Sequence, residues 1–151
     1  MDLILWRHAE AEEGTTDDLR RRLTSKGRKQ AARAADWLLQ RLPARFTLLA
    51  SPALRAHQTA QALGVPIKAD PKLAPGASAK AIIEACGWPD NKGAVVVVGH
   101  QPDLGRALAH LMCNVGGPWS IKKGAFWWIS NRVRDGDAQI VVRAVVSPDL
   151  L

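Results

Sequence analysis

The run Ala94-Val95-Val96-Val97-Val98-Gly99-His100 decides the fold of this chain. Four successive valines without polar alternation are typical of a strand in the middle of a sheet that is covered on both faces. The residues after the valines place an imidazole where this buried strand emerges into a loop. The run therefore predicts an α/β protein that carries a polar group at one edge of its central sheet.

A second apolar run, Leu3-Ile4-Leu5-Trp6, is too short for a helix and is followed directly by Arg7 and His8. We predict strands over residues 3–6, 46–50, 94–98, 125–129 and 139–146, with a short extended piece over 65–69. We predict helices over residues 24–41, 51–64 and 78–86, and a further one from residue 102. Thr24 and Ser51 are the expected N-caps of the first two helices.

Strands that alternate with helices predict a three-layer α/β sandwich with a mostly parallel central sheet. The tetrad Arg134-Asp135-Gly136-Asp137 is a hairpin signal, so the last two strands should form an antiparallel pair. A length of 151 residues is enough for one domain with a proper core, and we expect a single domain over residues 1–151.

Composition sets further expectations about location and partners. No apolar stretch approaches the roughly 20 residues needed to cross a bilayer, and the first residues lack the features of a signal peptide. We therefore expect a cytoplasmic protein with no membrane partner. We also expect it to be a monomer. Cys86 and Cys113 are too few for a disulfide framework and stand in no metal-ligand spacing.

The formal net charge of +7 is concentrated early in the chain. Much of the excess comes from Arg20, Arg21, Arg22, Lys26, Arg28, Lys29 and Arg33. A basic run of this kind is usually a solvated face, although it could also attract acidic partners or nucleic acid. Because no pattern of stacking aromatic residues accompanies it, we expect no nucleic-acid partner.

The candidate site residues should meet at one edge of the sheet. In open α/β sheets, ligands bind beyond the carboxyl ends of the strands, and Arg7, His8, Arg55 and His100 should all lie there. An imidazole with an unprotonated nitrogen is a competent nucleophile, and guanidinium groups bind phosphoryl oxygens through forked hydrogen bonds. The set points to phosphoryl transfer through a histidine nucleophile, with His8 as the attacking residue.

No cofactor and no metal are expected. Two imidazoles can bind a metal ion, but the arginines beside His8 and His100 repel cations. His57 and His110 are interpreted as structural or exposed residues of helices. Among the acidic residues after the first strand, Asp18 could reach the pocket and supply a proton.

The six tryptophans divide into two groups. Core packing accounts for Trp6 and for one of the neighbours Trp127 and Trp128, the other of which should face the opposite side of its strand. Trp88 and Trp119 lie in loops rich in proline and glycine, where they could rim the crevice.

Four segments of the chain resemble the histidine phosphatase superfamily, whose fold is the phosphoglycerate mutase-like fold. They are Leu5-Trp6-Arg7-His8-Ala9-Glu10-Ala11-Glu12, Arg21-Arg22-Leu23-Thr24 with Gly27, Ser51-Pro52-Ala53-Leu54-Arg55-Ala56-His57-Gln58-Thr59-Ala60, and Gly99-His100-Gln101-Pro102. Within the superfamily the chain looks most like the small SixA-type phosphohistidine phosphatases. The resemblance implies that His8 becomes phosphorylated and that Arg7, Arg55 and His100 bind the phosphate. Arg21 matches a pocket-edge arginine, although Arg22 replaces the proline that follows it in the family.

Larger members of the superfamily carry an acidic proton donor on an insertion after the Ser-Pro-x-x-Arg-Ala helix. Here residues 63–92 are too few for a capping subdomain, and the carboxylates Asp70, Glu84 and Asp90 stand in no recognisable motif. An alcohol leaving group needs a proton donor, whereas phosphohistidine releases an imidazole with a pKa of about 6.5.

We therefore expect a phosphatase acting on phosphohistidine in proteins. A small phosphate monoester or phosphoanhydride as the substrate of the same site is the alternative. A phosphate-recognition module without catalysis is a third interpretation.

Overall fold

A six-stranded sheet organises the protein, with strand order β3-β2-β4-β1-β5-β6. The computed structural model describes residues 1–14, 16–113, 117 and 119–151. The strands are β1 (Asp2–Arg7), β2 (Phe46–Ala50), β3 (Lys68–Ala69), β4 (Ala94–Gly99), β5 (Phe126–Arg134) and β6 (Asp137–Val146). β3, β2, β4 and β1 are mutually parallel, and β5 and β6 are antiparallel to their neighbours. The predicted mostly parallel sheet with a late antiparallel pair is confirmed.

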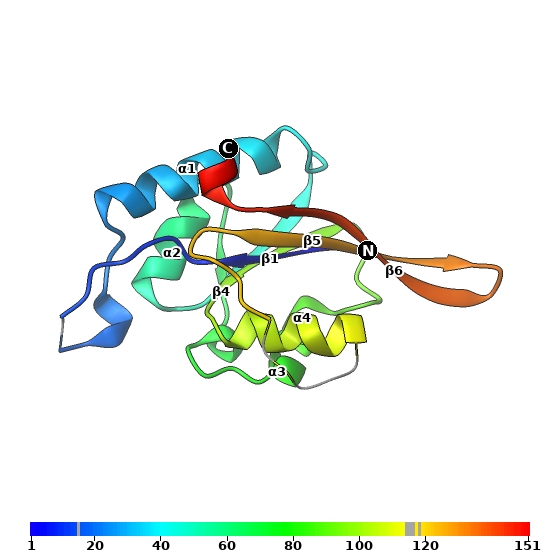
Figure 1. Ribbon diagram of the computed structural model, residues 1–151. Helices are drawn as coiled ribbons and strands as arrows, with labels where there is room; N and C mark the ends of the chain where they lie inside the picture. Colours follow the sequence, from blue (N-terminus) through cyan, green and yellow to red (C-terminus); the bar gives the residue numbers. More distant parts are fainter. Residues whose placement is uncertain (15, 114–116, 118) are drawn as a thin grey trace.

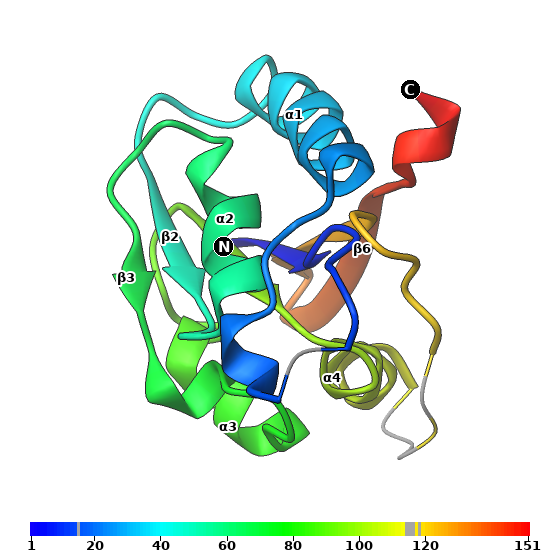
Figure 2. The same ribbon diagram turned by 90° about the vertical axis from the view of Figure 1, so that its left-hand side faces the viewer.

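Helices cover both faces of this sheet. They are α1 (Ser25–Leu39), α2 (Leu54–Gln61), α3 (Ala79–Cys86) and α4 (Asp103–Cys113), with 3-10 turns η1 (Asp18–Arg20), η2 (Pro71–Leu73) and η3 (Pro148–Leu150). α1 and α2 lie on one face, and α3 and α4 lie on the other (Figures 1 and 2). The predicted three-layer sandwich is confirmed, and the segment between α2 and β4 forms no capping subdomain.

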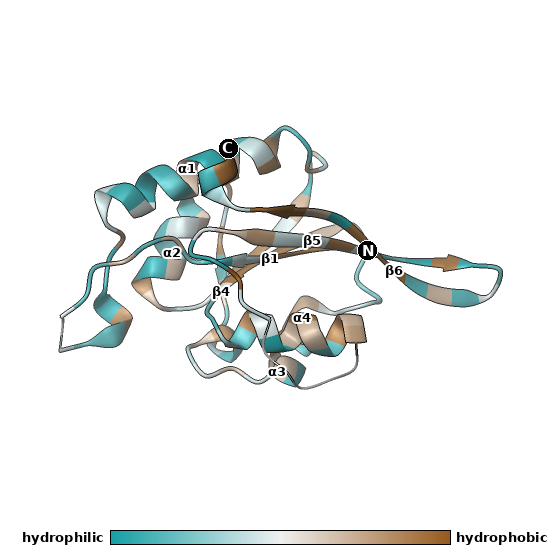
Figure 3. Cartoon of the chain, in the orientation of Figure 1, coloured by the Kyte–Doolittle hydropathy of each residue, from teal (hydrophilic) through white to brown (hydrophobic). Residues whose placement is uncertain are grey.

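The core follows from the period of two in the strands. On β1, Ile4 and Trp6 pack with the helices of one face, while Leu3 and Leu5 pack with those of the other. All six residues of β4 are buried, as the valine run predicts. In Figure 3 the hydrophobic colour is concentrated on the strands inside the sandwich, and the outer side of α1 is largely hydrophilic. No helix in the described part of the chain is both long and apolar enough to cross a membrane.

The predicted cap of α1 agrees with the structure, and both predicted ends of α2 differ from it. Thr24 caps α1, its hydroxyl accepting a hydrogen bond from the Gly27 N–H. The prediction that Ser51 caps α2 is wrong, because the helix begins at Leu54 and Ala53 stands at the N-cap without a side-chain bond. The Ser51 hydroxyl instead closes a short turn by accepting from the Ala53 N–H at 3.2 Å. At the other end α2 stops at Gln61, three residues before the predicted end at residue 64.

The β5–β6 hairpin is confirmed and longer than predicted. Asp135 (φ 53°) and Gly136 (φ 85°) form its two-residue turn in the left-handed conformation that such turns require. The added residues, 130–134 and 137–138, are mostly polar and exposed, so hydrophobic alternation could not reveal them. A register shift at Trp128/Ile129 further obscures the period of two.

The tryptophan predictions are partly right. Trp6 and Trp128 are buried on the α1 side of the sheet, and Trp127 packs on the opposite side. Trp119 does not rim the pocket described below, because its ring packs against Trp127 at a centroid distance of 5.4 Å. Trp88 lines a separate groove beside the β5–β6 hairpin.

Close packing of α1 on the loop after β1 yields a first testable prediction. A Cβ added at Gly27 would lie 1.9 Å from the Glu10 carbonyl oxygen. Alanine is usually favoured over glycine within a helix by about 1 kcal/mol, yet here the overlap must move the backbone. We expect Gly27→Ala to lower the free energy of unfolding by about 3 kcal/mol.

Urea denaturation at unchanged m-value measures the effect of Gly27→Ala. Lys29→Ala, at an exposed position of the same helix, is the matched control and should stay within about 0.5 kcal/mol of wild type. A Gly27→Ala protein as stable as the control would contradict this account of the packing.

Candidate active site

One pocket of about 450 Å³ lies at the carboxyl ends of the parallel strands. Arg7 ends β1 and pairs with Gly99 at the end of the neighbouring β4, so His8 and His100 follow from adjacent strands. Arg55 reaches the pocket from the first turn of α2. The residues predicted for the site all line this pocket: Arg7, His8, Arg21, Arg55 and His100.

The backbone of His8 is held between the end of β4 and the loop before β5. Its N–H donates to the Gly99 carbonyl at 3.0 Å, and its own carbonyl accepts from the Gly124 N–H at 3.1 Å. The ring is 7% exposed. Nδ1 lies 2.7 Å from the Ala9 carbonyl oxygen, which can only accept, so Nδ1 carries the ring proton. Nε2 is then left with a lone pair.

The surroundings of His8 keep Nε2 unprotonated. Burial, together with the nearby Arg55 and Arg7 charges, lowers the pKa of His8 to about 4 against the opposing effect of the hydrogen bond to Ala9. The Arg55 Nε–H donates to His8 Nε2 at 3.3 Å. At neutral pH, His8 therefore presents an unprotonated nitrogen next to a guanidinium group.

His100 lies opposite His8, with ring centroids 5.3 Å apart. Its Nε2 is 2.7 Å from the Ser51 hydroxyl, and its buried Nδ1 has no hydrogen-bond partner among the described residues. Because that hydroxyl oxygen accepts from the Ala53 N–H, its own proton is free to be donated to His100 Nε2. We therefore assign the proton of His100 to Nδ1. Burial, with His8 beside it, lowers the pKa of His100 to about 3.

The two arginines are fixed by backbone and acidic groups. The Arg55 side chain is buried, and its two terminal nitrogens donate to the carbonyl of Asp18 at 2.7 Å and to its carboxylate at 3.0 Å. Arg7 donates to the Ile121 carbonyl at 2.8 Å, and its buried Nε has no partner among the described residues. Both guanidinium groups are therefore already ordered when an anion binds.

Arg21 stands at the pocket edge, joined to η1 through Asp18. Its Nε donates to the Asp18 carboxylate at 2.9 Å, so this carboxylate bridges Arg21 and Arg55. Slight desolvation raises the pKa of Asp18, but the hydrogen bonds from both arginines outweigh it and the net pKa lies below the usual value. Asp18 does reach the pocket region, yet it is ionised at neutral pH and is poorly suited to supply a proton.

Sequence reasoning missed several residues around the pocket. Thr59 accepts from the Ala9 N–H at 3.0 Å and donates to the Arg55 carbonyl, so it fixes the loop beside His8. Asp103 accepts from the Gly76 N–H at 2.8 Å. Arg106 and Lys123 line the pocket on exposed side chains. Ser51 and Thr59 could have been predicted from the sequence, since both belong to the segment from Ser51 to Ala60 that resembles the superfamily.

The described residues place no group of three or more His, Cys, Asp or Glu where it could hold a metal ion. Of the three carboxylates between α2 and β4, none lines the pocket. Asp70 caps η2, Glu84 pairs with Lys80 on α3, and Asp90 lies in the separate groove near Trp88.

The sheet order and the pocket together define an α/β protein with the phosphoglycerate mutase-like fold. Residues 3–76 match the family model of the histidine phosphatase superfamily (branch 1). Over these 74 of its 151 residues the chain is similar to the histidine phosphatase superfamily. The matched region contains Arg7, His8, Arg21 and Arg55.

Two curated relatives, both uncharacterised proteins of Mycobacterium tuberculosis, are 34% identical to this chain over 99 residues. They come from the strains CDC 1551/Oshkosh and H37Rv. The alignment covers 64% of this chain, and the chain spans 62% of the length of these relatives.

Solved structures match nearly the whole chain. The protein histidine phosphatase SixA complexed with tungstate superposes with a TM-score of 0.83 at 24% identity, covering 99% of both chains. A Nakamurella multipartitia protein assigned as a phosphohistidine phosphatase SixA gives 0.77 at 26% identity, covering 97% of this chain and 95% of its own. An Entamoeba histolytica phosphoserine phosphatase mutant gives 0.71 at 17% identity over 99% and 98% of the two chains. At such low identity the first and third of these likenesses concern the fold alone.

Proposed function

We propose that this protein is a phosphatase that hydrolyses phosphohistidine in proteins through a covalent intermediate on His8. The observation that carries the proposal is the buried, unprotonated Nε2 of His8, which shares one pocket with two arginines and the free Nδ1 of His100. This arrangement suits a tetrahedral oxyanion, because phosphoryl transfer depends mostly on positioning and charge stabilisation. SixA, whose fold the chain shares, is a protein histidine phosphatase that binds tungstate, a tetrahedral oxyanion.

In the first step His8 Nε2 attacks phosphorus, and the P–N bond to the substrate histidine breaks. Arg7 and Arg55 bind the phosphoryl oxygens, and His100 Nδ1–H donates to one of them. The substrate ring carries a proton on its other nitrogen, so it leaves as neutral imidazole without a proton from the enzyme.

The second step is hydrolysis of the phosphorylated His8. Water attacks phosphorus, the bond to His8 Nε2 breaks, and the water proton passes to solvent as phosphate leaves. The Ala9 carbonyl holds a proton on His8 Nδ1 throughout, so His8 also departs as a neutral ring. Both leaving groups are therefore imidazoles of the same protonation state.

Among the described residues, two of the three carboxylates near the pocket, Asp18 and Asp103, favour phosphohistidine over an alcohol ester. Asp18 is held ionised by two arginines, and Asp103 is committed to the Gly76 N–H. Glu13, an exposed residue of the lining, favours the second candidate, a small phosphate monoester, because it could protonate an alkoxide. A phosphoanhydride substrate also fits the pocket, and so does a phosphate-recognition module without catalysis. The leaving-group chemistry supports either of these functions less than it supports hydrolysis of phosphohistidine.

Two peptides that differ only in the phosphorylated residue decide between these functions. One carries phosphohistidine and the other phosphoserine, each with uncharged flanks, beside a panel of sugar and nucleotide phosphates. We expect kcat/KM for the phosphohistidine peptide to be higher by about 100-fold, the factor that a missing general acid costs an ester. An equal or greater value for any ester would support the second candidate. Binding of all these compounds without release of phosphate would support the recognition module.

Other expectations from the sequence stay predictions. They are the single domain over residues 1–151, the monomeric state, the cytoplasmic location, and the lack of membrane and nucleic-acid partners.

A further inference from the structure

A groove lined by basic side chains runs from the active-site pocket to α1. A hollow of about 380 Å³ shares Arg7 and Lys123 with the pocket. A third hollow of about 300 Å³ shares Lys26 and Gln30 with the second. We call these last two hollows the basic groove. Its cationic residues are Arg7, Lys26, Lys29, Arg33, Lys122 and Lys123.

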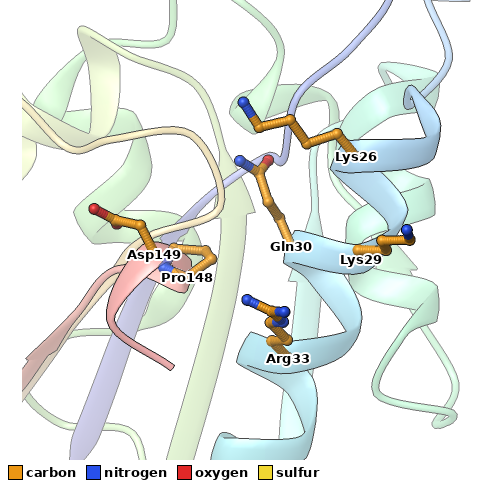
Figure 4. A pocket seen from close by; sticks show the side chains of 6 residues that line it. All are labelled: Lys26, Lys29, Gln30, Arg33, Pro148 and Asp149. Carbon is orange, nitrogen blue, oxygen red and sulfur yellow. The ribbon is translucent and has the colours of Figure 1, made fainter.

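The two walls of the basic groove come from distant parts of the chain. Lys26, Lys29 and Arg33 stand at positions i, i+3 and i+7 of α1, which share one side of a helix. Opposite them lie the loop before β5 and the 3-10 turn η3 (Figure 4). In this view Lys26, Gln30 and Arg33 extend from α1 toward Pro148 and Asp149.

The basic groove keeps an excess of positive charge. Its two carboxylates are already paired, Glu10 with Lys26 at 3.6 Å and Asp149 with Lys122 at 3.4 Å. Lys29, Arg33 and Lys123 form no ion pair with a side-chain carboxylate of any described residue, and the one side-chain hydrogen bond of Arg33 is to a main-chain oxygen of Leu151 at 3.5 Å. An anionic partner would therefore find cations that no described side-chain carboxylate neutralises.

The shape and lining suit an extended polypeptide. From Lys26 to Arg33 the helix rises about 10 Å, which matches about three residues of an extended chain. Among the described residues that line the groove, no aromatic ring offers a platform on which a nucleic-acid base could stack. The aliphatic stems of lysine and arginine instead form walls against which a peptide can pack.

We propose that the basic groove binds an acidic segment of the substrate protein, next to the phosphohistidine that enters the pocket. The proposal rests on the proposed function, because it names the kind of protein surface that this phosphatase would select. Glutamate and aspartate side chains near the phosphorylated histidine would meet Lys26, Lys29 and Arg33. The open pocket would then gain specificity from contacts outside it.

The test compares two synthetic phosphohistidine peptides of equal length, one with glutamates and the other with glutamines at the same flanking positions. We expect KM for the glutamate peptide to be about 10-fold lower at low salt, since each exposed ion pair contributes little alone. The difference should shrink toward none at about 1 M salt, where charges are screened over a few ångströms.

The groove variant is Lys26→Ala/Lys29→Ala/Arg33→Ala, and its matched control is Lys68→Ala/Lys72→Ala/Lys92→Ala. Both remove three exposed cations, and the control positions line none of the three hollows. We expect only the groove variant to lose the preference for the glutamate peptide. Hydrolysis of para-nitrophenyl phosphate should be unchanged in both variants, because none of the substituted residues lines the active-site pocket.

Direct binding separates failure of the groove from failure of the proposed function. Fluorescence anisotropy with phosphate-free glutamate and glutamine peptides requires no catalysis. Tighter binding of the glutamate peptide to wild type, lost in the groove variant alone, supports the groove even if neither phosphopeptide is hydrolysed. Equal binding of the two peptides, or tighter binding of a single-stranded RNA oligonucleotide at the same residues, overturns it.

Discussion

Replacing His8 by alanine is expected to abolish turnover, with kcat falling by about 10⁴-fold or more. The reason is chemical, because the variant has no nitrogen to accept the phosphoryl group. The other ring in the pocket belongs to His100, whose Nδ1 we assign as protonated and whose Nε2 is hydrogen-bonded to the Ser51 hydroxyl at 2.7 Å, so neither nitrogen presents a lone pair to the phosphoryl group. The loss corresponds to about 5.5 kcal/mol in the activation free energy.

The measurement has two parts. Steady-state phosphate release from the phosphohistidine peptide gives the loss of rate, and rapid quenching with labelled substrate detects the phosphoenzyme. Wild type should carry an acid-labile, alkali-stable phosphoryl group, and the His8→Ala protein should carry none. Substantial turnover by that protein would rule out the covalent mechanism whatever the substrate.

His57→Ala is the matched control for His8→Ala. His57 lies two residues after Arg55 on α2 but does not line the pocket. The His57→Ala protein should keep wild-type turnover and phosphoenzyme level. That result would show that losing a histidine near the site is not enough to abolish turnover. Circular dichroism of both variants establishes that each retains the fold.

The central part of the site could be predicted because it follows from where the buried strands end. The apolar runs before Arg7 and before His100 predict buried strands, and parallel buried strands place their carboxyl ends at one edge. In the structure β1 and β4 are neighbours with Arg7 opposite Gly99. The apolar runs thus predict that His8 and His100, 92 residues apart in the sequence, lie at the same edge of the sheet.

The outer part of the site could not be predicted, because it depends on how loops return to the sheet. Asp18 bridges Arg21 and Arg55 only because η1 folds back over the start of α2. Ser51 has the sequence of a helix cap, yet its partner is a histidine 49 residues away. Lys123 and Arg106 approach the pocket from segments with no local signal of a site.

Replacing Arg55 by alanine is expected to lower kcat/KM by about 10³-fold. Its guanidinium group is buried, always charged, and 3.3 Å from the attacking nitrogen of His8. It is therefore placed to bind the phosphoryl oxygens as charge redistributes in the transition state. Arg55→Lys keeps the positive charge but loses the paired N–H donors of the guanidinium group, so kcat/KM should fall less than in Arg55→Ala.

A second consequence of Arg55→Ala must be separated from the first. The change also breaks the ion pair of 3.0 Å with Asp18, which ties η1 to α2. Asp18→Asn removes the same ion pair and leaves the guanidinium group in place, so it measures the contribution of loop position alone. We expect Asp18→Asn to change kcat/KM by less than about 10-fold, because the partner carboxylate is exposed and such pairs contribute little. If Asp18→Asn and Arg55→Ala lose activity equally, Arg55 positions the loop and does not stabilise the transferred phosphoryl group.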